Sequence, residues 1–505
     1  MTQTRRDFLR RMGGAAAYAA AGEILCSTGL ADESNGAPLK LNILLFTADD
    51  MDGRSLGCFG GKPADLTPNL DRFASQGMRF ERAHVTAAIC MPSRIALSTG
   101  LYGHRSGAMG FRHARPGTPN APGLFQEAGY LTGILGKVDH STACTKDVWG
   151  YCFDREDLGD GRNPAIYQQR CADFFARCKA EKKPFYFMVN SHDPHRPFHR
   201  AGQTLKGSAE PSKTYRPQDV DVPGFLPDLP GVREEMSLYL NSARRCDDTF
   251  GRALDALREA GFEDNTLVVF LSDNGIAMPF AKANCYLAST RTPLIVRWPG
   301  QVRPGSVDNR HFVAGVDFLP TILEAAGIRQ PSRLDGRSFV PLLKGQSQPG
   351  RNEVFTQIDY LISKDAVPMR CIQNERYGYI FNPWSDGEFR YKNNNEGDSM
   401  KAMQMAAKTD ARIASRVDFF RYRVLEEFYD LQQDPDCLVN LMDDPRVAGA
   451  REALVARLRT WMVQTSDPAL AAFDQRHDRR ACRAAMEAAF ISGGPNAGAV
   501  RGENP

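Results

Sequence analysis

Four short apolar runs divide the first 300 residues of the chain, and each leads directly into polar, ionisable side chains. The runs occupy residues 39–46, 131–135, 185–189 and 267–271. Continuous apolar runs of this length are typical of strands that are buried on both faces of a parallel sheet. A long helix is expected over residues 232–260, between the last run and the one before it. The pattern predicts an α/β fold with a large central, mostly parallel sheet flanked by helices.

The residues that follow the runs are of the types that bind metals or transfer protons in active sites. They are Asp49 and Asp50, then Lys137 and His140, then His192, Asp193, His195 and Arg196, and finally Asp273 and Asn274. In open α/β sheets, ligands bind outside the carboxyl ends of the strands, so we expect these side chains to share one crevice. Each has a plainer explanation when taken singly, such as a solvated turn, a satisfied core histidine, a surface lysine or an Asx turn. Four coincidences of this kind favour a site.

A further motif, Cys90-Met91-Pro92-Ser93-Arg94, precedes an apolar stretch that ends in a glycine. Proline and serine suit the first turn of a helix, which places Cys90 near its N-terminus. Exposed backbone N–H groups and the helix dipole favour anions there, and Arg94, one turn along, would point at the same ligand. Taken alone, Cys90 is better explained as a buried or mildly activated thiol at a helix start.

Hard oxygen donors dominate the candidate site. Asp49, Asp50, Asp273 and Asn274 match Ca²⁺, or alternatively Mg²⁺, better than zinc. Positive charge and proton donors would surround the ion, from Arg94, Lys137, His140, His195 and a further lysine, Lys282. Such a site suits displacement at a sulfuryl or phosphoryl centre. A cysteine is a poor ligand for a hard ion, so residue chemistry alone leaves Cys90 unexplained.

The N-terminus predicts export. Arg5 and Arg6 precede a weakly apolar, Ala/Gly-rich stretch, which is the pattern of a twin-arginine signal peptide over residues 1–31. We expect a periplasmic or otherwise exported prokaryotic protein with the twin-arginine export machinery as a partner; the alternative is an amphipathic or disordered tail. The net charge is +3, and no basic run outside the leader indicates nucleic acid or a membrane surface. An oxidising compartment allows the twelve cysteines to form disulfides, but the connectivity cannot be read from their spacing.

Beyond the signal peptide we predict a catalytic domain over residues 39–350 and a smaller C-terminal α+β subdomain over 351–490. Short strands are expected at 354–358, 369–373 and 377–382, which would form a short antiparallel sheet, and an amphipathic helix at 451–461. Residues 491–505 are rich in glycine, proline and asparagine and are expected to be disordered.

The motifs together resemble those of the type I sulfatases, in which the cysteine of Cys-x-Pro-Ser-Arg is oxidised to formylglycine. Asp49-Asp50, Cys90, Gly136-Lys137 with His140, His192 to His195 and Ser272 to Gly275 occur in the family's order. The resemblance implies an alkaline-phosphatase-like sandwich, a metal site that includes the modified Cys90, and a formylglycine-generating enzyme as a partner. Asp335-Gly336-Arg337-Ser338, Pro368-Met369-Arg370 and Tyr429-Asp430-Leu431 are most similar to the heparan N-sulfatase (N-sulfoglucosamine sulfohydrolase) branch.

The resemblance also implies roles for single residues. Formylglycine made from Cys90 supplies the nucleophile as its hydrate, and His195 or Lys282 protonates the leaving group. Lys137 and Arg94 hold sulfate oxygens, His140 helps to restore the aldehyde, and the sugar contacts fall to His192, Asp193 and Arg196.

Two positions depart from the N-sulfatase pattern. His140 follows Lys137 by three residues instead of two, and Lys282 stands where that branch carries arginine. We therefore expect release of the N-sulfate of glucosamine at the end of heparan-type chains, with an O-sulfatase on glycosaminoglycans or other sulfated glycans as the alternative. A phosphonate or phosphate ester hydrolase is a further alternative. A sulfated-glycan binding protein without chemistry would lack a catalytic group, and none is missing from the sequence. The sequence does not define the oligomeric state, and a homodimer is one possibility.

Overall fold

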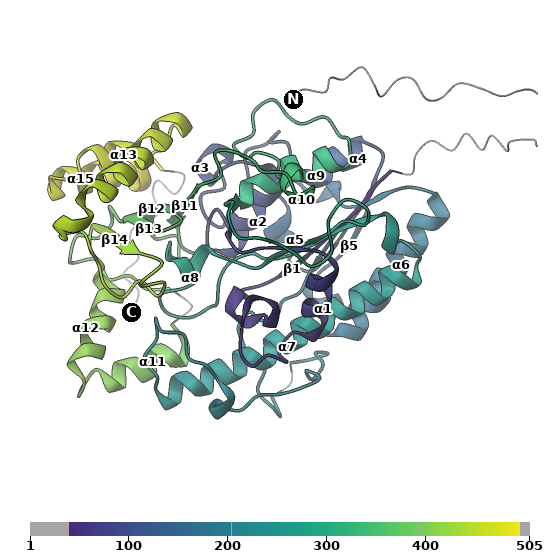
Figure 1. Ribbon diagram of the computed structural model, residues 1–505, viewed down its shortest axis with the longest axis horizontal. Coiled ribbons are helices and arrows are strands. Elements are labelled where there is room, and N and C mark those ends of the chain that lie inside the picture. Colours follow the sequence, from purple (N-terminus) through teal and green to yellow (C-terminus); the bar gives the residue numbers. More distant parts are fainter. Residues whose placement is uncertain (1–39, 204, 394–395, 495–505) are drawn as a thin grey trace, which may run out of the picture. The chain divides into compact units, whose positions relative to one another are not determined.

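The computed structural model describes residues 40–494 except 204 and 394–395 (Figure 1). The predicted signal peptide at 1–31 lies outside the described residues, as does most of the predicted tail at 491–505. The predicted domain limits therefore stay predictions. Across the part of the chain that is described, no helix combines the length and the apolar character needed to span a membrane.

The central sheet has eight strands in the order β5-β4-β6-β1-β7-β8-β2-β9. The four apolar runs form its inner strands, β4, β6, β1 and β7, which pair in parallel, so the prediction of a mostly parallel sheet is confirmed. Only β8 runs antiparallel to its neighbours, β7 and β2. The strands are β1 (Asn42–Ala48), β2 (Met78–Phe80), β4 (Leu131–Leu135), β5 (Tyr151–Phe153), β6 (Phe185–Asn190), β7 (Thr266–Ser272), β8 (Leu294–Arg297) and β9 (Ser306–Asp308). A separate pair joins β3 (Ala83–His84) to β10 (Val313–Ala314).

Helices cover both faces of this sheet, which explains why its inner strands are apolar throughout. Leu44 and Phe46 of β1 pack in one core with α1 (Pro68–Gln76), α6 (Pro164–Glu181) and α7 (Pro230–Glu259). Ile43 and Leu45 point the other way, into a second core with α4 (Ala121–Glu127), α9 (Phe318–Ala325) and α10 (Val340–Leu343). Figure 1 shows α6 and α7 on one side of β1, and α2, α4 and α9 on the other. The sheet is therefore the middle layer, and its carboxyl edge is left free to carry polar residues.

Short helices lie near that carboxyl edge. They are α2 (Cys90–Thr99), α3 (Gly103–Ser106), α5 (Val138–Ser141) and α8 (Leu287–Thr290). The predicted helix start at Cys90 is confirmed, because Cys90 is the first residue of α2, and Gly100 ends the helix in the left-handed conformation.

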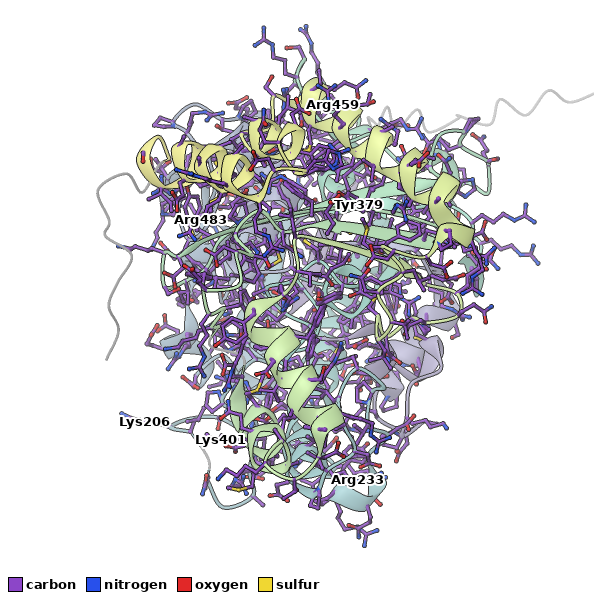
Figure 2. All side chains as sticks on the ribbon, turned by 90° about the vertical axis from the view of Figure 1, so that its left-hand side faces the viewer. Lys206, Arg233, Tyr379, Lys401, Arg459 and Arg483 are labelled. Atoms are coloured by element: carbon purple, nitrogen blue, oxygen red, sulfur yellow. The ribbon has the colours of Figure 1, made fainter. Side chains whose placement is uncertain are left out.

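The C-terminal part contains a four-stranded antiparallel sheet in the order β11-β12-β13-β14. Its strands are β11 (Glu353–Tyr360), β12 (Ala366–Asn374), β13 (Tyr377–Phe381) and β14 (Glu426–Asp430), of which the first three were expected. The helices here are α11 (Gly397–Ala406), α12 (Ala411–Tyr422), α13 (Ala448–Thr465), α14 (Leu470–Asp474) and α15 (Arg479–Glu487). Trp461 of α13 stacks on Phe355 of β11 with ring centroids 5.0 Å apart. Figure 2 looks toward this region, with Tyr379 on the sheet and Arg459 and Arg483 on α13 and α15.

All eleven cysteines in the described part of the chain are free thiols. Cys171 and Cys178, which are close in sequence, both lie on α6 and are buried in its apolar face. Cys144 and Cys152 are also unpaired. The described fold is therefore held by its hydrophobic cores without disulfide cross-links.

Candidate active site

The carboxyl ends of β1 and β7 bring the predicted acids together. Asp49 and Asp50 follow β1, and Asp273 follows β7, which is its neighbour in the sheet. One carboxylate oxygen of each lies within 4.8 Å of the others, and all three side chains are buried. Asp50 adopts the left-handed conformation (φ 71°), and its backbone N–H donates to Asp273 Oδ1 at 3.1 Å. Asn274 Nδ2 donates to Asp50 Oδ1 at 2.7 Å, which completes the predicted set of oxygen-bearing side chains.

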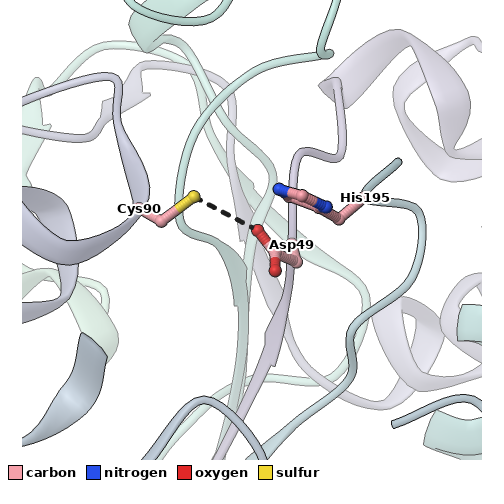
Figure 3. Close-up of side chains that lie close together, drawn as sticks. All are labelled: Asp49, Cys90 and His195. Atoms are coloured by element: carbon pink, nitrogen blue, oxygen red, sulfur yellow. Dashed lines mark hydrogen bonds between the residues drawn. The ribbon is translucent and has the colours of Figure 1, made fainter. Parts of the chain in front are cut away.

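Cys90 faces this group from the N-terminus of α2. Its Sγ lies 3.5 Å from Asp49 Oδ1 and 4.0 Å from Asp50 Oδ1. Figure 3 shows Cys90, Asp49 and His195 converging from the helix, the end of β1 and the loop after β6. Burial raises the pKa of the Cys90 thiol, and the surrounding carboxylates add to this, although Lys282 opposes it. The side chain is therefore an uncharged thiol at neutral pH.

Two lysines pair with the acids. Lys137, in the left-handed conformation at the start of α5, pairs with Asp49. Lys282 pairs with Asp50, and its Nζ lies 3.0 Å from Cys90 Sγ. Burial disfavours the Lys282 ammonium, but Asp50 and the neighbouring groups outweigh it and raise the pKa of Lys282. Lys282 is therefore a charged donor at the centre of the site.

Arg94 does not point at the ligand space as predicted. It is fully buried, and its Nε donates to Asp273 Oδ2 at 2.8 Å. Its Nη2 lies 2.8 Å from the same oxygen, and its Nη1 donates to Thr47 Oγ1 of β1 at 2.7 Å and to Asn190 Oδ1 of β6 at 2.8 Å. The guanidinium fits the gap between three adjacent strand ends, where it fixes the Asp273 carboxylate, and Arg94 is not among the residues that line the cavity above Cys90.

A cavity of about 310 Å³ opens above Cys90, and His140 and His195 line it together with Lys137 and Lys282. Burial lowers the pKa of His195 to about 4 and that of His140 to about 3, so both rings are neutral at neutral pH. His195 Nδ1 lies 2.6 Å from the Arg196 carbonyl oxygen and donates to it. Its Nε2 is thereby left as the atom nearest the acids, 3.9 Å from Asp50 Oδ2.

The three residues predicted to contact the sugar are placed differently from one another. Asp193 is fully buried and is held by Arg245 through both oxygens, at 2.7 and 3.0 Å, with Arg162 3.3 Å away. This corrects its predicted role, because its carboxylate anchors the loop after β6 and has no access to a sugar. His192 is buried and outside the cavity lining. Arg196 does line the cavity, where it also pairs with Glu235.

Part of the cavity wall was not predicted. Phe111 packs edge-on against the His140 ring, with centroids 5.5 Å apart. Leu361 and Ile362, in the turn between β11 and β12, and Asn393 form the wall contributed by the C-terminal part. Ile362 is 49% exposed. An exposed apolar residue in a turn carries no signal of its function in the sequence.

The charge balance fits a divalent cation. Among the described residues, three carboxylates are matched by Arg94, Lys137 and Lys282, so an added cation would leave an excess of positive charge for an anionic substrate. Asp50 Oδ2 and Asn274 Oδ1 are buried without a hydrogen-bond partner within the described part of the chain. Burial raises the pKa of Asp273 to about 7 against the pull of Arg94, and Asp49 and Asp50 raise it further. A cation held by these oxygens would relieve this crowding of acids, and their hard character suits Ca²⁺ or Mg²⁺.

Comparison with known proteins shows what the chain is similar to. The sulfatase family model matches residues 41–328, and the model described as "N-sulphoglucosamine sulphohydrolase, C-terminal" matches residues 277–403. The chain is 30% identical to human N-sulphoglucosamine sulphohydrolase over 86% of this chain and 92% of that one. It is 27% identical to an ulvan-active sulfatase of Formosa agariphila, over 87% and 84% of the two chains. A solved structure in complex with its substrate D-glucosamine-2-N,6-O-disulfate superposes with a TM-score of 0.62 at 19% identity, over 85% of this chain and 98% of that chain, which confirms the predicted fold class.

Proposed function

The chain belongs to the sulfatase family, and from that premise we propose that it removes the N-sulfate of glucosamine at the end of heparan- or heparin-type chains. Sulfatase activity on sulfated sugars follows from its relatives. The N-sulfate preference is supported by one observation above all. The similarity to N-sulphoglucosamine sulphohydrolase continues through the C-terminal part, which supplies the outer wall of the cavity.

The size of the cavity supports action at a chain end. At about 310 Å³ it lies at the small end of ligand pockets and suits a single sugar residue. Leu361 and Ile362 give it an apolar wall opposite the charged floor. A sugar ring would lie against this wall with its sulfate directed toward Lys137 and Lys282.

We propose that Cys90 is oxidised to formylglycine by a formylglycine-generating enzyme, and that the modified side chain joins Asp49, Asp50, Asp273 and Asn274 around Ca²⁺, with Mg²⁺ as the alternative. The unmodified thiol is uncharged and soft, which makes it a poor nucleophile and a poor ligand among hard oxygens. When bound, the cation would draw charge from a sulfate oxygen and favour ionisation of a hydroxyl of the hydrated formylglycine.

The chain's own side chains divide the remaining work. Lys137 and Lys282 hold the sulfate oxygens through their ammonium groups. Lys282 Nζ carries a proton that can be given to the departing nitrogen or oxygen, whereas His195 can give one from Nε2 only after that nitrogen has been protonated, because the neutral ring carries its proton on Nδ1. Neutral His140 accepts a proton on the opposite wall. Arg94 acts indirectly, because it fixes Asp273.

We further propose that the protein is exported to the periplasm through the twin-arginine pathway. That pathway carries folded proteins, and the absence of disulfides among the described residues is compatible with folding in a reducing cytoplasm. Folding after export would expose the thiols to oxidation. Detection of the mature protein in a periplasmic fraction, and its retention in the cytoplasm when Arg5 and Arg6 are changed to lysine, would support this; export of the changed protein would contradict it.

Mass spectrometry of the tryptic peptide 83–94 tests the modification. Active enzyme is expected to carry formylglycine at position 90 in place of cysteine. An unmodified thiol in fully active protein would refute the formylglycine proposal. Cys90→Ala supplies the inactive reference.

Sulfate release tests the substrate. We expect turnover of N-sulfoglucosamine in preference to 6-O-sulfated N-acetylglucosamine and to a matched phosphate ester. The O-sulfatase alternative is favoured by the structural neighbour whose substrate carries both 2-N and 6-O sulfates. Turnover of the 6-O-sulfated sugar alone would establish that alternative.

A further inference from the structure

A second cavity, of about 590 Å³, lies at the edge of the eight-stranded sheet. Its floor includes β9, the outermost strand on that side, and Met78 at the start of β2. One wall is the turn after β8, and the other is the segment 342–347 at the end of α10. Among the described residues it shares no lining side chain with the catalytic cavity, and it is the larger of the two.

Three cations line this edge cavity without partners. Arg303, Arg310 and Lys344 are exposed, and their side chains form no ion pair or hydrogen bond with any described residue. Many exposed arginines elsewhere are paired, as Arg446 is with Asp444 and Arg459 with Asp474. A cluster of unpaired charges of one sign attracts ligands of the opposite sign.

The cavity has one acid, and it is already engaged. Asp308 Oδ1 accepts from the backbone N–H groups of Arg310 and His311, both at 2.9 Å. Its Oδ2 accepts from His311 Nδ1 at 2.7 Å. Because both oxygens are committed to the loop 308–311, Asp308 holds the shape of that loop and does not pair with the arginines.

The other lining groups suit a carbohydrate. Gln301, Asn309 and Gln346 offer amides that can donate to and accept from hydroxyls. Val307, which is 40% exposed, offers apolar area to a sugar ring. A guanidinium binds the oxygens of a tetrahedral anion in pairs, as it does with phosphate.

We propose that the edge cavity is a second binding site, for an internal stretch of a sulfated oligosaccharide. The choice of a sulfated sugar as occupant rests on the proposed function. The site would hold the polymer while its end is processed, which raises the concentration of chain ends at the catalytic cavity.

Direct binding tests this. Full-length Cys90→Ala enzyme, which does not consume its ligand, is titrated with a heparin-type octasaccharide and with N-sulfoglucosamine. The test variant adds Arg303→Gln, Arg310→Gln and Lys344→Gln. The loss of three exposed ionic contacts should lower the octasaccharide affinity of the test variant roughly tenfold. Its octasaccharide binding should also depend less on salt, and its affinity for the monosaccharide should not change. In the Cys90 enzyme, KM for the octasaccharide should rise while kcat/KM for the monosaccharide stays the same.

The matched control carries Lys408→Gln, Arg479→Gln and Arg480→Gln, which remove the same charge from exposed side chains on other elements. It should keep the wild-type affinity. Equal losses in both triple variants would reduce the effect to net charge and overturn the proposal, as would no loss in either. Equal affinity for a desulfated octasaccharide, or saturation of the cavity by inorganic sulfate alone, would also overturn it.

The two proposals fail separately. Enzyme that releases no N-sulfate but loses octasaccharide affinity only in the test variant would refute the proposed function and support the second site. Turnover of N-sulfoglucosamine with octasaccharide binding unchanged in the test variant would support the proposed function and refute the second site. The six substituted cations are exposed and have no partner within the described ranges, so we expect the melting temperatures of both triple variants to match that of the parent.

Discussion

At the scale of single residues, Lys282 both neutralises a buried carboxylate and stands beside the proposed nucleophile. Lys282→Met should lower kcat for N-sulfoglucosamine by at least about a hundredfold, because a charged donor beside Cys90 is lost. It should also destabilise metal-free protein by about 3–5 kcal/mol, since the buried Asp50 loses its ion-pair partner. Added Ca²⁺ should restore much of this stability. Activity assays and thermal melts with and without Ca²⁺ check both effects.

Cys90→Ala is the control, because it should lose activity while Lys282 and Asp50 remain paired. Equal melting temperatures of metal-free wild type and Lys282→Met would contradict the electrostatic part of the prediction. Retention of full kcat by Lys282→Met would contradict the chemical part.

His84 of β3 predicts a pH effect on stability away from the site. It is buried, with Nδ1 3.1 Å from Thr290 Oγ1, and burial lowers its pKa to about 3. Below pH 6.5 the His84 ring binds a proton in the unfolded chain but stays neutral in the folded protein. The free energy of unfolding that the neutral, buried ring contributes is therefore complete above pH 6.5 and is lost as the pH falls toward 3. Between pH 7 and pH 5 the loss amounts to about 2 kcal/mol.

His84→Gln keeps a hydrogen-bonding side chain but does not titrate. The free energy of unfolding, measured with denaturant, should fall between pH 7 and pH 5 in both proteins. The fall should be smaller in His84→Gln than in the wild type by about 2 kcal/mol. The other buried histidines are common to both proteins and cancel in this comparison. Equal drops would show that His84 is accessible to protons.

The sequence predicted residues whose position follows from the backbone and missed those whose position follows from packing. Asp49, Asp273 and Cys90 sit at strand ends or a helix start, so a pattern of strands was enough to bring them together. The direction of Arg94 depends on Thr47 and Asn190, which lie on two strands distant in sequence. The burial of Asp193 depends in the same way on Arg245 of α7, and nothing local to either residue indicates the pair.

At the scale of elements, Arg423 after α12 ties the C-terminal part to the loop that carries Lys282. Its guanidinium donates to Asn284 Oδ1 at 2.7 Å and to the Tyr286 hydroxyl at 2.5 Å. Phe280 and Ala283, on either side of Lys282, have φ values of 65° and 64°, which are strained for residues other than glycine. The contacts of Arg423 therefore help to hold a strained loop in place.

Arg423→Lys keeps the charge but cannot reproduce both hydrogen bonds. We expect kcat to fall about tenfold, the effect of slight misplacement of a catalytic group, while KM changes little. The control is Arg416→Lys. Arg416 lies over the Phe280 ring, as Arg423 does, but its hydrogen bond goes to the Phe225 carbonyl and not to Asn284 or Tyr286. Steady-state kinetics should separate the two variants, and an equal fall in kcat would show that only general stability is involved.

Elements differed in how far they could be predicted. The inner strands were predicted within a few residues because burial on both faces leaves a continuous apolar run. The long helix α7 and three strands of the small sheet were also predicted within a few residues. β14 was missed because it begins with two glutamates, whose charges are satisfied by partners elsewhere, as Glu427 is by Tyr286. α6 was also missed, although Asn163 as its N-cap with Pro164 at its first position was a recognisable start.

At the scale of the whole molecule, the free cysteines predict indifference to reductant. The described fold contains no disulfide, and its buried thiols serve as small apolar side chains. Calorimetric melting should therefore give the same melting temperature with and without a phosphine reductant. A fall of several degrees in reductant would reveal a cross-link that the structure does not contain.

The catalytic cavity is assembled from two sources that differ in how freely they can change. Its floor is fixed by adjacent strand ends, where Arg94, Asp49 and Asp273 depend on one another and tolerate little. Its outer wall includes Leu361 and Ile362 at the tip of the hairpin formed by β11 and β12, of which Leu361 is buried and Ile362 is exposed. On the proposed function, we expect sulfate chemistry and sugar choice to be separable in heredity. Descendants of such an enzyme would acquire new glycans through changes at the exposed Ile362, while the residues that carry the reaction are inherited unchanged.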